Sequence, residues 1–155
     1  MYKILVTGSI HKIGLEMLRK EKDIEIHYAP DLPYAEILKI ITPFHCILSR
    51  SETAIPKELI DKASKLKVIA RAAVGIGNID VNYATEKGIL IINTPGKNTN
   101  SAAELTIGLL LSAMRKMIPA HIHMSELKWD RHTFTGTELL GKTIGIIGLG
   151  NVGHR

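Results

Sequence analysis

Three glycines near the end of the chain have the spacing of a phosphate-binding turn. Gly148, Gly150 and Gly153 follow a short apolar run at 143–147 that has the composition of a buried strand. In such a turn the first glycine permits a tight bend, the second lets the backbone approach a pyrophosphate, and the third lets the next helix pack close to the strand. The N-terminus of that helix would hold the phosphates with its free N–H groups. A plain glycine turn is the alternative, and the preceding strand favours nucleotide binding over it.

The histidines and the cysteine do not form a recognisable metal-binding or nucleophilic motif. His121 and His123 are two residues apart on a predicted helix, so they do not share a face. The single cysteine, Cys46, lies in an apolar run at 44–48, where a buried hydrophobic residue is a better interpretation than a nucleophile. We therefore predict no metal site and no disulfide, and we interpret all seven histidines as structural or surface residues.

The composition is that of an ordinary globular protein, with 45% hydrophobic and 23% charged residues. The formal net charge of +5 suits an anionic ligand, but the sequence has no lysine and arginine block of the length that nucleic-acid binding requires. No signal peptide follows Met1, and the longest apolar run, at 105–114, is too short to span a bilayer. We therefore expect a cytoplasmic protein with neither a nucleic-acid nor a membrane partner.

Short β-prone runs alternate with helical patterns through the first 95 residues. The predicted strands lie at 3–7, 24–26, 45–48, 68–70 and 89–92. Helices are predicted between them, at 10–20, 34–41, 57–63 and 81–87. This alternation predicts an α/β lobe, with a parallel sheet that carries helices on both faces. Gly88 is the predicted C-terminal stop of the last of these helices.

A second helical pattern follows this lobe. Ser101 and Glu104 have the spacing of a capping box, which predicts the start of a helix. That helix is apolar over much of its surface and needs burial on more than one side. Pro119 is predicted to kink or end it. The strand at 143–147 and its glycines would then begin a second lobe that these residues do not complete.

Four blocks of the sequence occur in the same order in one known family. They are 71–80, 93–98 with 101–111, 129–139, and 141–153. Through these blocks essentially the whole chain resembles the NAD-dependent D-2-hydroxyacid dehydrogenases, and within that family most closely the D-3-phosphoglycerate dehydrogenases. The resemblance implies a flavodoxin-like, parallel-sheet substrate-binding lobe at 1–96. It implies that 97–155 supply the connecting helix and the first strand and glycine turn of a Rossmann NAD-binding domain.

The resemblance also implies an activity and a partner. The complete enzyme would transfer a hydride between NAD and a D-2-hydroxy acid and would form a homodimer. The candidate substrate is 3-phosphoglycerate, which would place the enzyme in serine biosynthesis. NADP stays open, because the residue that discriminates it from NAD would lie after Arg155. The family's catalytic arginine, glutamate and histidine match no position here, so we expect an inactive N-terminal part of a longer enzyme.

Site residues follow from the resemblance at matching positions. It implies substrate contacts at Arg50, Ser51, Val74, Gly75 and Asn98. It implies cofactor contacts at Val74, Thr106, Gly148, Gly150, Asn151, Val152 and Gly153. An arginine suits a substrate anion because its planar guanidinium binds carboxylate or phosphate. The alternatives are a solvated surface arginine, ordinary turn residues and, for Thr106, a threonine in a helix interior.

Several points stay open at the level of sequence. Gly77 stands where the family has aspartate, which leaves open how its loop is ordered. Arg50, Arg71 and Lys97 could each bind either a phosphate or a carboxylate, so they do not name the substrate. Two other functions are compatible with the chain: a non-catalytic, self-associating truncated binding module, and an NAD-sensing regulator of the same fold.

Overall fold

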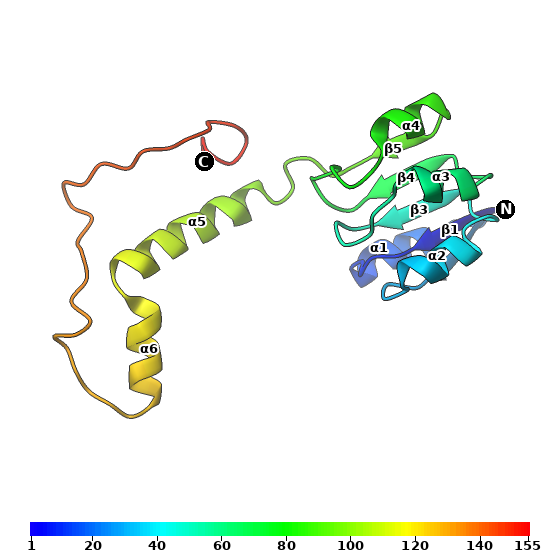
Figure 1. Ribbon diagram of the computed structural model, residues 1–155. Helices are drawn as coiled ribbons and strands as arrows, with labels where there is room; N and C mark the ends of the chain where they lie inside the picture. The colour runs from blue at the N-terminus through cyan, green and yellow to red at the C-terminus, as the bar shows by residue number, and fades with distance from the viewer. The chain divides into compact units, whose positions relative to one another are not determined.

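Five parallel strands form the sheet of the computed structural model, which describes residues 1–155. The strands are β1 Tyr2–Val6, β2 Ile24–Tyr28, β3 Cys46–Ser49, β4 Val68–Arg71 and β5 Leu90–Ile92. Their order in the sheet is β2-β1-β3-β4-β5, and every neighbouring pair is parallel (Figure 1). The predicted α/β class is confirmed, and each of the five strands overlaps its predicted range.

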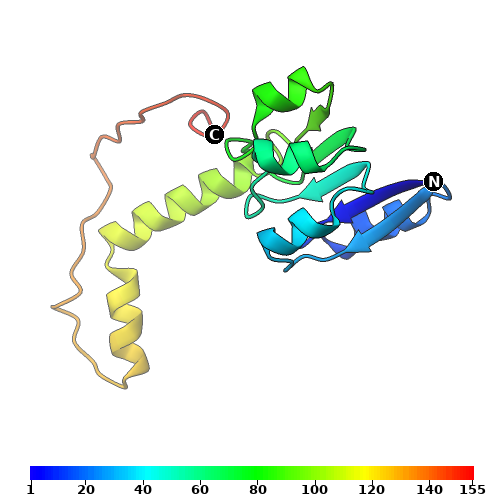
Figure 2. The same ribbon diagram turned by 45° about the vertical axis from the view of Figure 1, so that its right-hand side comes forward.

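Four helices cover the two faces of this sheet unequally. They are α1 Lys12–Arg19, α2 Tyr34–Ile40, α3 Lys57–Lys62 and α4 Val81–Glu86. Apolar residues of α2, α3 and α4 pack on one face of the sheet, whereas α1 packs on the other (Figure 2). The lobe therefore has two hydrophobic cores of different size.

The larger core is centred on a row of side chains that crosses the sheet. Leu5, Ile47 and Ile69 are register neighbours on β1, β3 and β4, and none of them is exposed to solvent. Successive side chains of a strand point to opposite faces, so Leu90 and Ile92 on the edge strand β5 point to the face of α1. Both remain at least half exposed, because α1 packs on β1, β2 and β3 only.

The last helix of this lobe ends at a glycine, as the sequence predicts. Gly88 has a φ of 71°. Its N–H donates to the Thr85 carbonyl at 2.9 Å, and the N–H of Ile89 donates to the Ala84 carbonyl at 2.9 Å. These two bonds are the Schellman motif, which satisfies the last carbonyls of a helix through a residue in the left-handed conformation.

Gly88→Ala is expected to lower the free energy of unfolding of residues 1–95 by about 1 kcal/mol, because alanine is disfavoured at positive φ. A Cβ at Gly88 would meet no atom within 4 Å, so the penalty is conformational and not steric. Urea unfolding followed by far-UV circular dichroism measures the loss. Gly77→Ala is the matched control, since its Cβ would also meet no atom and its φ is not in the left-handed region. A similar loss in both variants would contradict this account.

Residues Gly96–Arg155 form a second compact unit, distinct from Met1–Pro95. It contains α5 Thr99–Met114 and α6 Met117–Ser125, and it contains no strand. The assignment of the two units to a substrate lobe and an NAD-binding domain stays a prediction.

The strand predicted at 143–147 is not formed. The segment is irregular, and Ile144, Ile146 and Ile147 are largely exposed. A strand needs a hydrogen-bonded neighbour to be stable, and Gly96–Arg155 offers no other strand with which this segment could pair. The apolar, β-prone composition of the run is therefore not sufficient to form a strand.

The start of α5 and the break after it also differ from the prediction. α5 begins at Thr99 after the N-cap residue Asn98, so Ser101 lies inside its first turn and does not cap it. Lys116, with a φ of 51°, separates α5 from α6. Pro119 is the third residue of α6, within the first turn, where a missing N–H leaves no helical hydrogen bond unmade. The predicted break exists, but it precedes the proline.

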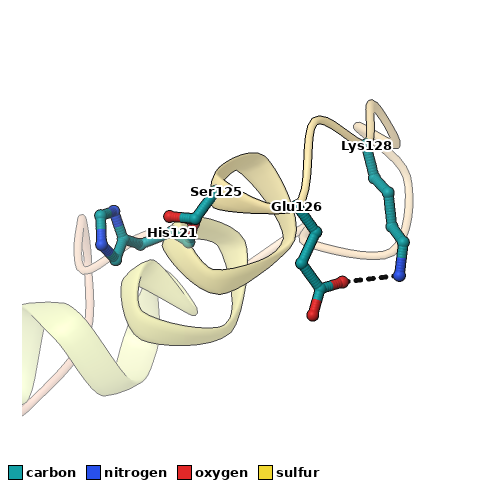
Figure 3. A network of polar contacts seen from close by, with 4 residues as sticks. All are labelled: His121, Ser125, Glu126 and Lys128. Atoms are coloured by element: carbon teal, nitrogen blue, oxygen red, sulfur yellow. Dashed lines mark hydrogen bonds and ion pairs between the residues drawn. The ribbon is translucent and has the colours of Figure 1, made fainter.

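Polar contacts at the end of α6 are local. The hydroxyl of Ser125 donates to the carbonyl of His121 at 2.9 Å, and Lys128 pairs with Glu126 at 2.6 Å (Figure 3). The imidazole of His121 points away from the Glu126 carboxylate (Figure 3). Exposed ion pairs of this kind contribute less than about 1 kcal/mol. These contacts lie at the C-terminal end of α6. They do not form an acid–base pair.

Candidate functional site

The predicted substrate residues of the first lobe lie at the carboxyl edge of its sheet. Arg50 and Ser51 directly follow β3, and Val74 and Gly75 follow the end of β4. Strands β3 and β4 are neighbours, so the two loops leave the sheet side by side. In open α/β sheets ligands bind at this edge, next to the point where the strand order reverses. That point lies between β1 and β3 here.

Arg50 is in close contact with the loop that follows β1. A Cβ added to Gly8 would lie 2.7 Å from Cγ of Arg50 and 2.8 Å from its backbone nitrogen. The guanidinium Nη1 donates to the carbonyl of Ser9 at 3.3 Å, and the residue is otherwise exposed. Gly8 is therefore required by the close approach of two backbones, and its absent side chain makes room for Arg50.

Gly8→Ala is expected to lower the free energy of unfolding by about 2 kcal/mol, because overpacking against a backbone atom forces the two segments apart. Urea unfolding measures the change. Gly14→Ala is the control from the helix that follows. Its Cβ would approach only the flexible side chain of Ile10, at 3.3 Å, and alanine favours the helix. A loss in Gly8→Ala no larger than that in the control would contradict the close approach.

Arg71, considered above as a possible anion ligand, is buried. It ends β4 and is only 1% exposed. Its guanidinium donates to the carbonyl of Arg50, to that of Thr53 at 3.0 Å and to Oδ1 of Asn78 at 2.9 Å. Burial lowers the pKa of Arg71, and the charge of Glu52 partly opposes that change. The proposed role of Arg71 as a direct phosphate ligand does not hold, because protein acceptors occupy both of its terminal nitrogens.

Asn78 belongs to the same network, and the sequence reasoning missed it. Its Nδ2 donates to the carbonyl of Ser51 at 2.7 Å and to that of Thr53 at 3.3 Å. Its own backbone carbonyl accepts the N–H of Ile55 at 2.9 Å. An asparagine in a glycine-containing loop is typical of a turn. The residues around Asn78 in the sequence do not indicate that its side chain bonds to residues more than 20 positions away.

The loop that contains Gly77 is held by other residues. Nδ2 of Asn93 donates to the carbonyl of Val74 at 2.8 Å, and the N–H of Thr94 donates to the carbonyl of Ala73 at 3.2 Å. A Cβ at Gly77 would meet no atom within 4 Å. The segment after β5 therefore supports this loop, and no side chain at position 77 is needed for it.

The glycine turn of the second unit has neither the preceding strand nor the following helix that its spacing predicts. Gly148 has a φ of 94°, and a Cβ at Gly153 would overlap the carbonyl oxygen of Gly148. A Cβ at Gly150 would meet no atom within 4 Å. The first and third positions thus require glycine, and the second leaves open space. The predicted pyrophosphate contact at Gly150 stays a prediction.

Part of the predicted cofactor set borders one groove within the second unit. The groove has a volume of about 820 Å³ and is lined by Thr106 on α5 and by Val152 and Gly153. The Thr106 hydroxyl donates to the Ala102 carbonyl at 2.8 Å, which is common for threonine within a helix. Asn98 makes no capping hydrogen bond with its side chain. It precedes α5 in the second unit.

Other chemistry-bearing groups do not cluster. The structure has no group of three or more histidine, cysteine, aspartate or glutamate residues that could hold a metal ion. Burial raises the pKa of the Cys46 thiol to about 11, although a hydrogen bond with the Ala70 backbone partly opposes this. Cys46 is therefore protonated at neutral pH. None of the helices combines the length and the apolar character needed to cross a bilayer.

The model of one protein family covers almost the whole chain. The family is described as the D-isomer specific 2-hydroxyacid dehydrogenases, catalytic domain, and its model matches residues 4–151. The chain belongs to this family. The resemblance stated from four sequence blocks is thereby confirmed.

Two curated relatives and one solved structure illustrate the similarity. D-3-phosphoglycerate dehydrogenase from Methanocaldococcus jannaschii is 44% identical over 155 residues, which are 100% of this chain and 29% of that protein. Hydroxypyruvate reductase from Thermotoga maritima is 39% identical over 153 residues, 99% of this chain and 50% of that protein. The NAD⁺-bound crystal structure of 3-phosphoglycerate dehydrogenase from Entamoeba histolytica has a TM-score of 0.75 at 29% identity and covers 99% of this chain and 48% of that one. The chain thus spans half or less of the length of each.

Proposed function

We propose that this chain is the N-terminal part of an NAD-dependent D-2-hydroxyacid dehydrogenase. In the proposal, residues 1–96 bind the anionic substrate and residues 97–155 begin the NAD-binding domain. The observation that carries it is that Arg50 and Ser51 follow β3 and that Val74 and Gly75 follow the neighbouring strand β4, at the edge of a parallel sheet where ligands of such folds bind. The NAD⁺ present in the Entamoeba histolytica relative supports the cofactor.

The proposed substrate is a small 2-hydroxy acid with a second anionic group, and 3-phosphoglycerate is the candidate. The name of the Methanocaldococcus jannaschii relative supports it, and the Thermotoga maritima relative keeps related 2-oxo acids within the class. Arg50 would bind the anion with its planar guanidinium. The N–H groups near Val74 and Gly75 would hold a carboxylate. Bound NAD would accept the hydride from C2 of the substrate.

Within residues 97–155, the proposed cofactor contacts are Thr106, Gly148, Gly150, Asn151, Val152 and Gly153, with Val74 contributed by the first lobe. The open space at Gly150 suits the pyrophosphate, and the groove beside Thr106 suits an apolar part of the ligand. Asn98 is proposed as a further substrate contact. The preference for NAD over NADP belongs to the same proposal.

We expect the 155 residues to bind substrate without turning it over, because no position matches the family's catalytic arginine, glutamate and histidine. The test is titration of the pure chain with 3-phosphoglycerate, monitored by amide NMR shifts, together with an assay for NADH at 340 nm. Shifts at Arg50, Ser51, Val74 and Gly75 without NADH formation are the expected result. Arg50→Ala should weaken binding, so that the shifts appear only at higher 3-phosphoglycerate concentrations. Measurable turnover by the pure chain would contradict the expected inactivity, and absent shifts would contradict the substrate site.

A self-associating, non-catalytic module is the second candidate, and the surface of α5 favours it. Leu105, Ile107, Leu109 and Leu111 are each more than 40% exposed on this one helix. An apolar helix surface of this extent needs a covering partner. We propose a homodimer formed by a second copy of the chain, and sedimentation at micromolar concentration tests it. A single monomeric species would argue against it.

A further inference from the structure

We infer that Arg71 is a positioning residue: it fixes the turn that carries Arg50, and through Asn78 it joins that turn to the loop after β4. This inference rests on the proposed function, in which Arg50 contacts the substrate anion. It assigns to Arg71 an indirect role, distinct from that of a ligand.

Hydrogen bonds hold the turn at both of its ends. Arg71 reaches across from β4 and donates to the carbonyls of Arg50 and Thr53, which are 21 and 18 residues away in the sequence. The Thr53 carbonyl also accepts Nδ2 of Asn78, and the Thr53 hydroxyl donates to Oγ1 of Thr7 at 3.1 Å. The backbone of the turn is therefore tied to β4 on one side and to the end of β1 on the other.

Arg50 is restrained from two directions by these contacts. Its carbonyl accepts the bond from Arg71, and its backbone nitrogen lies against the space that a side chain at Gly8 would occupy. The backbone of Arg50 therefore has little freedom, whereas its side chain is exposed. A guanidinium on a fixed backbone loses less conformational entropy when it binds an anion than one on a mobile loop.

The cost of burying the Arg71 charge also favours a positioning role for this residue over a stabilising role. None of the ion pairs in the structure includes Arg71, so neutral carbonyl and amide acceptors solvate its terminal nitrogens, whereas its Nε is buried without a hydrogen-bond partner. Burial of an ion costs several kcal/mol, and well-packed apolar residues often serve stability equally well. The planar guanidinium holds two carbonyls and one amide in a fixed geometry, which an apolar side chain cannot do.

The same network couples the two candidate substrate loops. Asn78 accepts from Arg71 and donates to the carbonyl of Ser51 at 2.7 Å. The backbone adds to this, because Ile55 bonds to the carbonyl of Asn78 at 2.9 Å and Asp80 bonds back to the carbonyl of Ile55 at 3.0 Å. A ligand that orders one loop should therefore order the other.

The test measures binding of 3-phosphoglycerate to the full 155-residue chain by NMR titration. Arg71→Lys keeps the positive charge but removes the planar guanidinium. We expect it to weaken binding about tenfold. Asn78→Ala should weaken binding in the same direction. Arg19→Lys is the matched control, since Arg19 is exposed at the end of α1, and it should bind as the unmodified chain does. Circular dichroism confirms that each variant is folded.

A double-mutant cycle separates positioning from a general structural role. In an Arg50→Ala background, we expect Arg71→Lys to change the dissociation constant by less than about twofold, because the group that it positions is absent. The loss of stability, in contrast, should be similar in both backgrounds. Equal weakening of binding in both backgrounds would overturn the inference.

The other outcomes distinguish the inference from the proposed function. Unaltered binding by Arg71→Lys would overturn the inference and leave Arg50 as the proposed anion contact. No binding by the unmodified chain, or unaltered binding by Arg50→Ala, would overturn the proposed function and the inference with it. If Arg71→Lys does not fold, the same cycle is measured with Asn78→Ala, since Asn78 is an exposed residue.

Discussion

Ile47→Ala is expected to lower the free energy of unfolding of residues 1–95 by about 4 kcal/mol. Ile47 lies on β3, the central strand of the sheet, and is not exposed. Its register neighbours Leu5 and Ile69 are equally buried, so the space left by the truncated side chain has rigid walls. The loss combines the transfer of the missing methyl groups with the cost of an incompletely filled cavity.

Urea unfolding measured by far-UV circular dichroism is the appropriate assay for Ile47→Ala. Tryptophan fluorescence is unsuitable, because the single tryptophan, Trp129, lies in the second unit. Leu90→Ala is the matched control, since Leu90 is also on a strand but is 57% exposed. The control should lose less than about 1 kcal/mol. Equal effects of the two substitutions would show that the row across the sheet is not the centre of the core.

Cys46 is expected to react with iodoacetamide at pH 8 on the order of 100-fold more slowly in the folded chain than in the unfolded chain. The reactive species is the thiolate, and a pKa of about 11 leaves little of it at this pH. Partial burial on β3 also limits access of the reagent. Mass spectrometry after timed quenching measures the rate. The chain has no other cysteine, so every added mass reports this site. A folded rate within a few-fold of the unfolded rate would contradict the burial.

The same thiol makes stability depend on pH above neutrality. Because the folded-state pKa is raised, the unfolded chain loses this proton near pH 8.5 whereas the folded chain keeps it until about pH 11. The contribution of Cys46 is therefore fully present below pH 8.5 and declines as the pH rises to 11, by about 3 kcal/mol in total. Cys46→Ala lacks this decline, so the difference between the two pH profiles isolates it. Parallel profiles would contradict the raised pKa.

The strands and helices of residues 1–95 could be predicted because their signals are local. A run such as 68–70 is apolar and lies between turn-forming segments, and the alternation with helices requires a parallel sheet. Gly88 could be placed for the same reason, since a helix that ends there needs a residue tolerant of positive φ. Each of these inferences depends on a few consecutive residues.

The errors arose where a local pattern was not sufficient to determine the structure. The run at 143–147 has the composition of a strand, but no strand in its own unit can pair with it. Ser101 and Glu104 have the spacing of a capping box, yet the helix begins at Thr99. Local spacing could not indicate that an upstream residue would take the cap position.

The candidate site shows the same division between local and distant signals. Arg50 and Ser51 could be proposed only through the family resemblance, and their position after a strand agrees with it, because ligands bind at that edge of such sheets. The burial of Arg71 could not be foreseen, because it depends on carbonyls about 20 residues earlier in the chain. An arginine that directly follows three apolar strand residues is the one sequence feature that could have indicated a buried role.

All five strands of the sheet come from the first 92 residues, and this has a consequence for synthesis. The ribosome would need several seconds to add the 60 residues of Gly96–Arg155, at about 5–20 residues per second. Mixed α/β domains of this size fold in about milliseconds to a second. The first lobe, with the turn of Arg50 already anchored, is therefore expected to form while the later residues of Gly96–Arg155 are still being translated.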